Sequence, residues 1–139
     1  GKGFFLMYML DTNTCIHVLK NRDELLRRKF RATPELCISS VTYGELYFGI
    51  ENGIRAMRSE RISQLELFTR RLLIDAWDEV AAKHYGMIRA NLKHQGLIIG
   101  NNDLWLAAHA RAEGLILVTN NEREFVRVPE LVVENWVDA

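Results

Sequence analysis

The sequence predicts an α/β fold in which a mostly parallel central sheet carries helices on both faces. Short runs of continuous apolar residues are typical of strands that are covered on both sides. These runs alternate along the chain with segments of helical periodicity, which is the pattern of a parallel sheet. No repeat, low-complexity tract or linker divides the 139 residues. We therefore expect residues 1–139 to form one domain, with no structural pattern in Gly1–Gly3.

The first half of the chain contains three predicted strands and four predicted helices. The strands cover residues 5–10, 36–39 and 72–74. The helices cover residues 14–20, 23–31, 41–52 and 55–71. Asn52-Gly53 is a standard helix stop signal, and the helix that follows it is amphipathic, with Ile62, Leu65 and Phe68 on one side.

The second half continues the alternation. Asp78 is a suitable N-cap for a helix that runs to about Gln95. Its apolar face is predicted from residues that recur every four positions, widened by three neighbours: Val80, His84, Ile88 and Leu92, with Ala81, Tyr85 and Met87. A helix over 104–113, a strand over 115–119, a helical turn over 123–126 and a strand over 131–133 complete the chain.

Composition excludes few functions. The 18 basic and 18 acidic residues balance, so the net field alone would not hold a nucleic acid, although a bound metal ion would add positive charge locally. Cys15 and Cys37 lie in apolar surroundings and are expected to be buried free thiols. No apolar stretch approaches the roughly 20 residues that span a membrane, and residues 4–10 lack a cleavage site. We predict a cytoplasmic protein with no membrane partner.

Four oxygen-bearing side chains are predicted to meet at one edge of the sheet. Asp11 follows the first strand directly, and Asn121 follows the strand 115–119. Glu45 and Asp103 lie in the first turns of their helices. Functional sites of parallel sheets lie outside the carboxyl ends of the strands. We therefore expect these four residues to form the catalytic site.

Each of these residues also has a purely structural interpretation. Asp11 and Asn121 are suited to caps and turns. Glu45 follows Thr42 at the spacing of a capping box, and Asp103 complements the dipole of its helix. A joint acidic cluster, however, would repel itself without a cation. Hard oxygen ligands select Mg²⁺ or Mn²⁺, which would activate water for attack on a phosphodiester.

Four segments around these residues carry a family resemblance. They read Leu-Asp-Thr-Asn at 10–13, Ser-Ser-Val-Thr-Tyr-Gly-Glu-Leu at 39–46, Gly-Asn-Asn-Asp-Leu-Trp-Leu-Ala-Ala-His-Ala at 100–110, and Val-Thr-Asn-Asn-Glu-Arg-Glu-Phe at 118–125. In this order and spacing they resemble the motifs of PIN-domain ribonucleases and, more narrowly, of the VapC toxins of bacterial toxin–antitoxin pairs. The resemblance covers about Met7 to Trp136 and implies a PIN-like three-layer sandwich.

The resemblance also implies roles for individual residues. The three acids match the metal ligands of the family, which would hold Mg²⁺ or Mn²⁺. Asn121 matches a fourth position that is Asp in many PIN domains and Asn in a VapC subgroup. Asn13 and Thr119 match supporting positions beside the ligands.

Substrate and partners follow from the same resemblance. It implies cleavage of structured RNA, with the anticodon loop of initiator tRNA as the expected target, neutralisation by a VapB-like antitoxin, and a homodimer. A basic cluster that includes Arg27 and Arg28 suits phosphate contact with RNA, although a solvated charged face is its ordinary meaning.

Three alternatives remain at this point. The same acids would serve a DNA or flap-type nuclease, but such chains carry extra acids and insertions. A catalytically weak PIN scaffold that binds nucleic acid or a partner would need some further defect. A phosphoryl-accepting receiver domain would use Asp75, after the third strand, but it also requires a lysine after the fifth strand, and residues 131–138 contain none.

Overall fold

The computed structural model describes residues 7–20 and 23–137 and contains a five-stranded sheet in the order β3-β2-β1-β4-β5. The strands are β1 (Tyr8–Leu10), β2 (Leu36–Ser39), β3 (Leu73–Asp75), β4 (Ile116–Val118) and β5 (Val132–Glu134). All four strand pairs in this part of the chain are parallel, which confirms the predicted fold class. The predicted strand start at Phe5 and the unpatterned Gly1–Gly3 lie outside the described residues.

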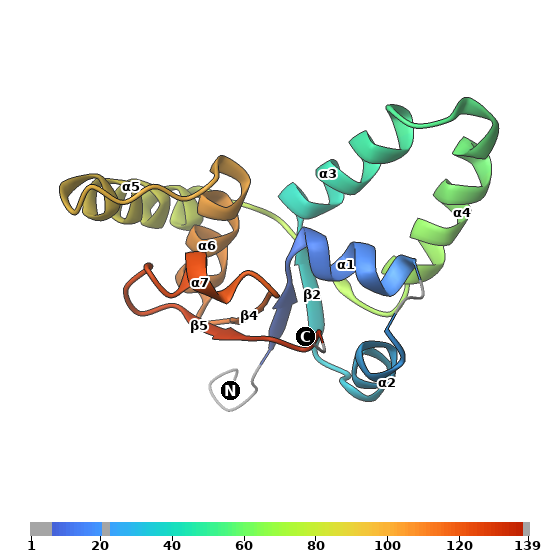
Figure 1. Cartoon of the computed structure of the whole chain (residues 1–139), viewed down its shortest axis with the longest axis horizontal. Helices are drawn as coiled ribbons and strands as arrows, with labels where there is room; N and C mark the ends of the chain where they lie inside the picture. The colour runs from blue at the N-terminus through green and yellow to red at the C-terminus, as the bar shows by residue number, and fades with distance from the viewer. Residues whose placement is uncertain (1–6, 21–22, 138–139) are drawn as a thin grey trace.

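Helices cover both faces of the sheet (Figure 1). They are α1 (Thr12–Leu19), α2 (Glu24–Ala32), α3 (Ser40–Glu51), the 3-10 turn η1 (Arg55–Met57), α4 (Arg58–Thr69), α5 (Glu79–His94), α6 (Asn101–Glu113) and α7 (Glu122–Phe125). Helices α1 to α4 lie on one side of the sheet and α5 to α7 on the other. None of the helices in the described ranges is long and apolar enough to cross a membrane.

The central strands contribute to two separate hydrophobic cores. Met9 packs with α5, α6 and α7, whereas the next residue, Leu10, packs with the first four helices. The neighbouring strands alternate in the same way, through Cys37 and Ile38 in β2 and Leu117 and Val118 in β4. Successive side chains of a strand point to opposite faces. Because both faces are apolar, the strands read as continuous apolar runs, and the molecule has three layers.

Two details of the predicted helices are wrong. The segment 55–71 is not one helix, because its first turn is the 3-10 turn η1, a common form at helix starts, and α4 begins only at Arg58. In α5, Val80 and Met87 are 44% and 53% exposed. A four-residue spacing drifts by about 40° per step around a helix of 3.6 residues per turn. The stripe is therefore buried at Ile88 and Leu92 but exposed at Val80, and Met87, predicted as a neighbour that widens the stripe, lies outside the buried face.

Candidate active site

Asp11 joins the first strand to the first helix. Its backbone N–H donates to the carbonyl oxygen of Val118, 2.9 Å away, so the sheet continues to this residue. Its Oδ1 accepts a hydrogen bond of 2.8 Å from the backbone N–H of Thr14 and caps α1. The side chain is 3% exposed. The structural interpretation of Asp11 as an N-cap is therefore correct, and it coexists with a position at the carboxyl edge of the sheet.

Glu45 is oriented by two neighbours. The hydroxyl of Thr12 donates to Oε1 at 2.8 Å, and the amide of Asn102 donates to Oε2 at 2.6 Å. The capping box with Thr42 does not form, because Ser39 caps α3 instead, through a hydrogen bond from the backbone N–H of Val41. With the cap at Ser39, Glu45 lies in the second turn of α3, beside α1 and the start of α6.

Asp103 lies in the first turn of α6, close to other carboxylates. Burial and, after it, the carboxylates of Glu124, Asp11 and Glu45 together raise the pKa of its carboxyl to about 6. Like charges disfavour ionisation only at short range. The structure therefore brings the three predicted acids into one electrostatic neighbourhood, together with Glu124, which the sequence analysis did not single out.

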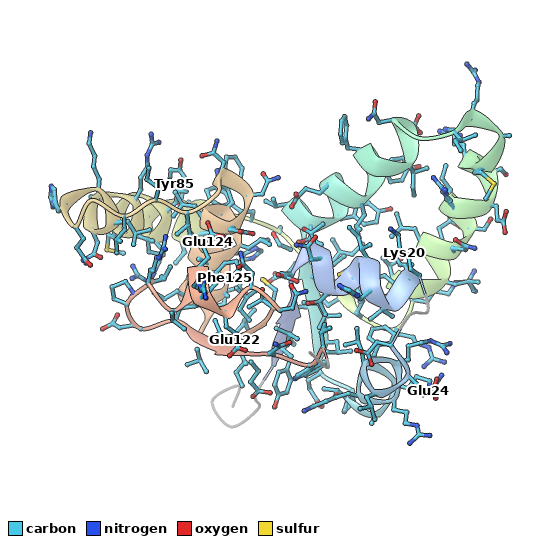
Figure 2. The ribbon with its side chains drawn as sticks, in the orientation of Figure 1. Lys20, Glu24, Tyr85, Glu122, Glu124 and Phe125 are labelled. Carbon is cyan, nitrogen blue, oxygen red and sulfur yellow. The ribbon has the colours of Figure 1, made fainter. Side chains whose placement is uncertain are left out.

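Asn121 and Glu124 form a unit at the start of α7, and Figure 2 shows Glu124 beside α6. The Asn121 amide donates to Glu124 Oε2 at 2.6 Å, and the backbone N–H of Gly100 donates to Oε1 at 2.8 Å. The backbone N–H of Asn121 donates to the buried hydroxyl of Thr119 at 2.9 Å. The sequence signal for Glu124 was its spacing, since residues three apart share one face of a helix.

The donor set fits a hard divalent cation. Carboxylate and amide oxygens are the ligands of Mg²⁺ and Mn²⁺. Among the described residues, no Lys or Arg forms an ion pair with Asp11, Glu45 or Asp103, so their charge lacks a cationic partner. Their oxygens do not all lie within 4.8 Å of one another. Binding of one ion by all three therefore requires the side chains to move together.

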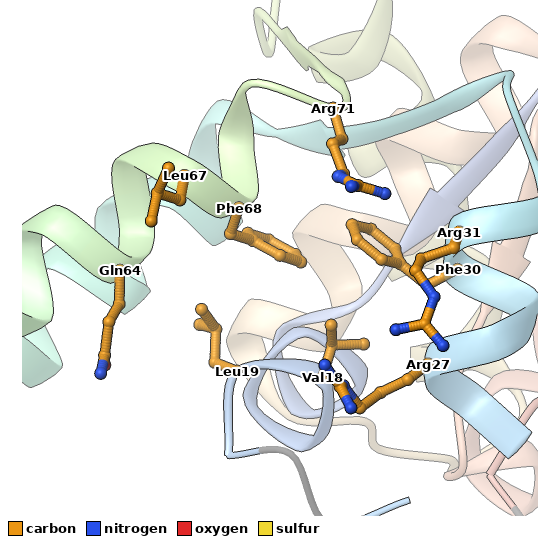
Figure 3. A pocket seen from close by; sticks show the side chains of 9 residues that line it. All are labelled: Val18, Leu19, Arg27, Phe30, Arg31, Gln64, Leu67, Phe68 and Arg71. Atoms are coloured by element: carbon orange, nitrogen blue, oxygen red, sulfur yellow. The ribbon is translucent and has the colours of Figure 1, made fainter. Parts of the chain in front are cut away.

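The remaining predicted residues lie around or away from this edge. Asn13 is exposed on α1. Arg28 is 69% exposed and lies 3.5 Å from a carboxylate oxygen of Glu24. Arg27 lines a surface pocket of about 460 Å³ between α1, α2 and α4. Figure 3 shows the guanidinium groups of Arg27, Arg31 and Arg71 around the rings of Phe30 and Phe68. Helix α2 follows the far end of α1, so both predicted arginines lie away from Asp11.

Comparisons with known proteins agree with this architecture. A model of the PIN domain family matches residues 8–131. The chain is 49% identical over 133 residues to "Ribonuclease VapC2" of Haemophilus influenzae, covering 95% of this chain and 99% of that protein. It is 43% identical over 132 residues to "tRNA(fMet)-specific endonuclease VapC" of Salmonella typhimurium, covering 94% of this chain and 98% of that protein.

A solved structure has the same fold. The crystal structure of DNA-bound VapBC from Salmonella typhimurium contains a chain that superposes with a TM-score of 0.89 at 41% identity, covering 95% of this chain and 99% of that chain. The sequence match extends over nearly the full length, and the sheet and helix layers agree. The chain therefore belongs to the PIN-domain family and, within it, to the VapC proteins.

Proposed function

We propose that this protein is a metal-dependent endoribonuclease toxin that cleaves structured RNA. The observation that carries the proposal is that Asp11, Glu45 and Asp103 lie in one electrostatic neighbourhood at the carboxyl edge of the sheet. Burial, together with the carboxylates of Glu124, Asp11 and Glu45, raises the pKa of Asp103 to about 6. The names of two relatives, a ribonuclease and a tRNA(fMet)-specific endonuclease, support RNA as the substrate and initiator tRNA as the first target to test.

Asp11, Glu45 and Asp103 would hold Mg²⁺ or Mn²⁺. When bound, such an ion polarises a phosphodiester and lowers the pKa of a coordinated water. The chain's own residues keep the site ordered. Thr12 and Asn102 fix both oxygens of Glu45, and such supporting hydrogen bonds orient ligands toward a common point.

Two further residues hold Asn121 at the start of α7. Thr119 holds the backbone of Asn121, and Glu124 holds its amide nitrogen. These two contacts fix the orientation of Asn121, and its amide oxygen is the side-chain atom that would contact a bound ion. With Asn rather than Asp at this position, the proposed site carries one negative charge less, and a second ion would bind more weakly.

The experiment that tests this function is cleavage of a bacterial tRNA pool with Mg²⁺ or Mn²⁺, beside Asp11→Asn. Asn is as good an N-cap as Asp, so the variant keeps the start of α1. We expect discrete fragments from the unmodified protein and a loss of more than about 100-fold in the variant, since even supporting residues of metal sites are worth 10–100-fold. Full cleavage by the variant, or in excess EDTA, would contradict metal-dependent catalysis.

The same assay separates RNA from DNA as the substrate. Fragments of flapped or single-stranded DNA that vanish in Asp11→Asn, with no RNA fragments, would support the DNA nuclease. An absence of all fragments despite measured metal binding would support a binding scaffold.

We also propose that a VapB-like antitoxin neutralises the protein at a pocket that begins at Glu45. This pocket of about 530 Å³ lies between α1, α3 and α4. Its lining combines apolar side chains, including Leu46 and Leu65, with the basic Lys20 and Arg61. Such a surface suits an amphipathic helix with acidic edges. The solved neighbour from Salmonella typhimurium is a VapBC complex, which supports this partner.

Gly49 offers a clean test of the antitoxin pocket. It lines the pocket, and a Cβ at this position would meet no atom within 4 Å. Gly49→Glu should therefore weaken inhibition by the antitoxin while cleavage of RNA persists. Gly86→Glu, an exposed helical glycine on α5, is the matched control. Equal inhibition of both variants would place the antitoxin elsewhere.

We also propose that the protein forms a homodimer. Tyr43 and Tyr47 pack against the core beneath α1 to α4, with ring centroids 5.9 Å apart. Phe48, on the same helix, is 67% exposed and is the aromatic side chain of this group that a second copy could cover. Phe48→Glu should lower the molar mass measured by light scattering from that of a dimer to that of a monomer. An unchanged mass would exclude this surface.

A further inference from the structure

A second cluster of ligand-type side chains lies apart from the candidate active site. Asp75 ends β3, and His109 and Glu113 are one turn apart near the end of α6. Their ligand atoms all lie within 4.8 Å of one another. His109 Nε2 is 2.7 Å from Glu113 Oε2 and 3.3 Å from Asp75 Oδ2. The cluster shares no residue with the acids around Asp103.

The imidazole at the centre of this cluster is buried and unpartnered on one side. His109 is 0% exposed. Its Nε2 makes no hydrogen bond within the described part of the chain, despite the two carboxylate oxygens nearby. Because the shorter separation is within hydrogen-bonding range, it is the direction of the N–H bond that is unfavourable. A buried polar atom without a partner is costly, so this nitrogen points to a ligand.

The other ring nitrogen has the partner that a metal-bound histidine needs. His109 Nδ1 lies 2.8 Å from Ser39 Oγ, which also accepts a hydrogen bond from the backbone N–H of Val41. Ligating histidines usually donate their second N–H to a nearby oxygen, which fixes the tautomer. In the tautomer whose Nδ1–H is directed at Ser39, Nε2 carries no hydrogen and would offer its lone pair to an ion between the two carboxylates. Burial lowers the pKa of His109 and favours the neutral ring that a metal binds.

The charge of the cluster also lacks compensation. No Lys or Arg among the described residues forms an ion pair with Asp75 or Glu113. Burial, followed by the neighbouring Asp75, raises the pKa of Glu113 to about 8. A divalent cation between the carboxylates and the imidazole would relieve this repulsion.

We propose that Asp75, His109 and Glu113 form a site for a divalent transition-metal ion of the Zn²⁺ type. One imidazole and two carboxylates suit Zn²⁺, whereas Mg²⁺ prefers oxygen ligands alone. Ligand atoms around tetrahedral zinc lie about 3.3 Å apart, close to the separations found here. The Asp75 and Glu113 side chains are 22% and 36% exposed, which gives an ion a path from solvent and leaves a fourth position for water.

A metal ion at this site would link β3, α6 and the start of α3. β3 is an edge strand of the sheet, and the ion would tie its end to α6. Through His109 and Ser39, the site also reaches the N-cap of α3, the helix that carries Glu45. The metal would therefore stabilise the frame of the candidate active site and take no part in cleavage.

The test measures metal binding and needs no RNA. Asp11→Asn/Asp103→Asn serves as the background, because it weakens the candidate active site. Zn²⁺ is titrated calorimetrically in excess Mg²⁺, and Co²⁺ is followed by its visible absorption. We expect about one equivalent to bind. Adding Asp75→Asn or Glu113→Gln should weaken binding at least about 10-fold, whereas Glu66→Gln, an exposed carboxylate on α4, should change nothing.

Circular dichroism on each variant verifies that the fold persists, and the ring nitrogen resonances of His109 report on the ligand directly. Zn²⁺ should shift the Nε2 resonance in the background and leave it unchanged in Glu113→Gln. The proposal is wrong if the background binds no Zn²⁺, or if both carboxylate variants bind Zn²⁺ and Co²⁺ as the background does. Cleavage of tRNA by the unmodified protein is measured separately, so the two proposals fail independently.

Discussion

At the scale of single residues, the hydrogen bond from Thr12 to Glu45 should affect both RNA cleavage and stability. Thr12→Val removes the donor to Oε1 and keeps the shape of the side chain. We expect cleavage to fall about 10-fold, as for other residues that support metal ligands, and the free energy of unfolding to fall by about 1 kcal/mol. Single-turnover cleavage and denaturant unfolding measure these changes.

The control for this prediction is Thr69→Val, which removes a hydroxyl that donates to the carbonyl oxygen of Glu66 in its own helix. Its cleavage rate should match that of the unmodified protein. Unchanged cleavage in Thr12→Val would show that Glu45 does not depend on this hydroxyl.

Asp103 links pH to the stability of the metal-free protein. The pKa of its carboxyl is raised from 3.8 to about 6 in the folded state, so folding strengthens proton binding. The contribution of Asp103 to stability is therefore fully present below pH 3.8 and is lost as the pH rises through about 6. The free energy of unfolding of the unmodified protein, minus that of Asp103→Asn, should fall across this range.

Denaturant unfolding of both proteins at a series of pH values in EDTA measures this difference, in which the titration of carboxylates remote from Asp103 cancels. Addition of Mg²⁺ above pH 6 should restore stability to the unmodified protein more than to the variant. A difference that does not change with pH would mean that neither burial nor the neighbouring carboxylates raise the pKa of Asp103 in the folded protein.

The sequence predicted some site residues and missed others for a physical reason. Asp11 was placed at the sheet edge because a strand end fixes the position of the next residue. Glu124 lies three residues after Asn121, a spacing that could have indicated it. The contact between Thr12 and Glu45, in contrast, depends on side-chain directions and on helices that start a few residues away from their predicted positions. Such contacts between distant segments leave no periodic signal in the sequence.

At the scale of elements, two glycines should respond to the same substitution with opposite sign. Gly114 ends α6 with φ of +66°, and a Cβ there would meet no atom within 4 Å. Gly114→Ala should therefore cost about 1–2 kcal/mol from backbone conformation alone. Gly86 lies within α5 and also has open space for a Cβ, so Gly86→Ala should stabilise by about 0.5–1 kcal/mol.

Chemical denaturation of both variants measures this pair, and each serves as the control for the other. Equal effects of the same sign would show that neither conformation determines the outcome.

Strands were easier to predict than the faces of helices. The central strands β2 and β4 are buried on both sides, so their apolar runs leave little freedom in position, and β2 has the predicted bounds. The buried side of α5 depends on how the helix rotates against α6, which the spacing of Val80 and Met87 did not reveal. The start of α4 depends on the turn η1, for which the residues 55–57 give no distinct pattern.

At the scale of the whole molecule, the positive and negative charges balance, so RNA binding should depend on local clusters of basic residues. If Arg27 and Arg28 contact phosphates, Arg27→Gln/Arg28→Gln should weaken RNA binding and reduce the slope of log affinity against log salt by about 0.7–0.9 per contact. Fluorescence titration with tRNA over a range of salt concentrations measures the slope. Arg70→Gln/Lys83→Gln removes two exposed charges elsewhere and should leave it nearly unchanged.

The layered architecture has a consequence for the two thiols. Cys15 belongs to the core under α1 to α4, and Cys37 to the core under α5 to α7, so the sheet separates them and they remain unpaired. Burial raises the pKa of both thiols, that of Cys37 to about 12, which makes them inert while the protein is folded. Alkylation of each cysteine would therefore measure the opening of the core on one side of the sheet. The rates of alkylation at the two positions would reveal whether the layers open together or one at a time.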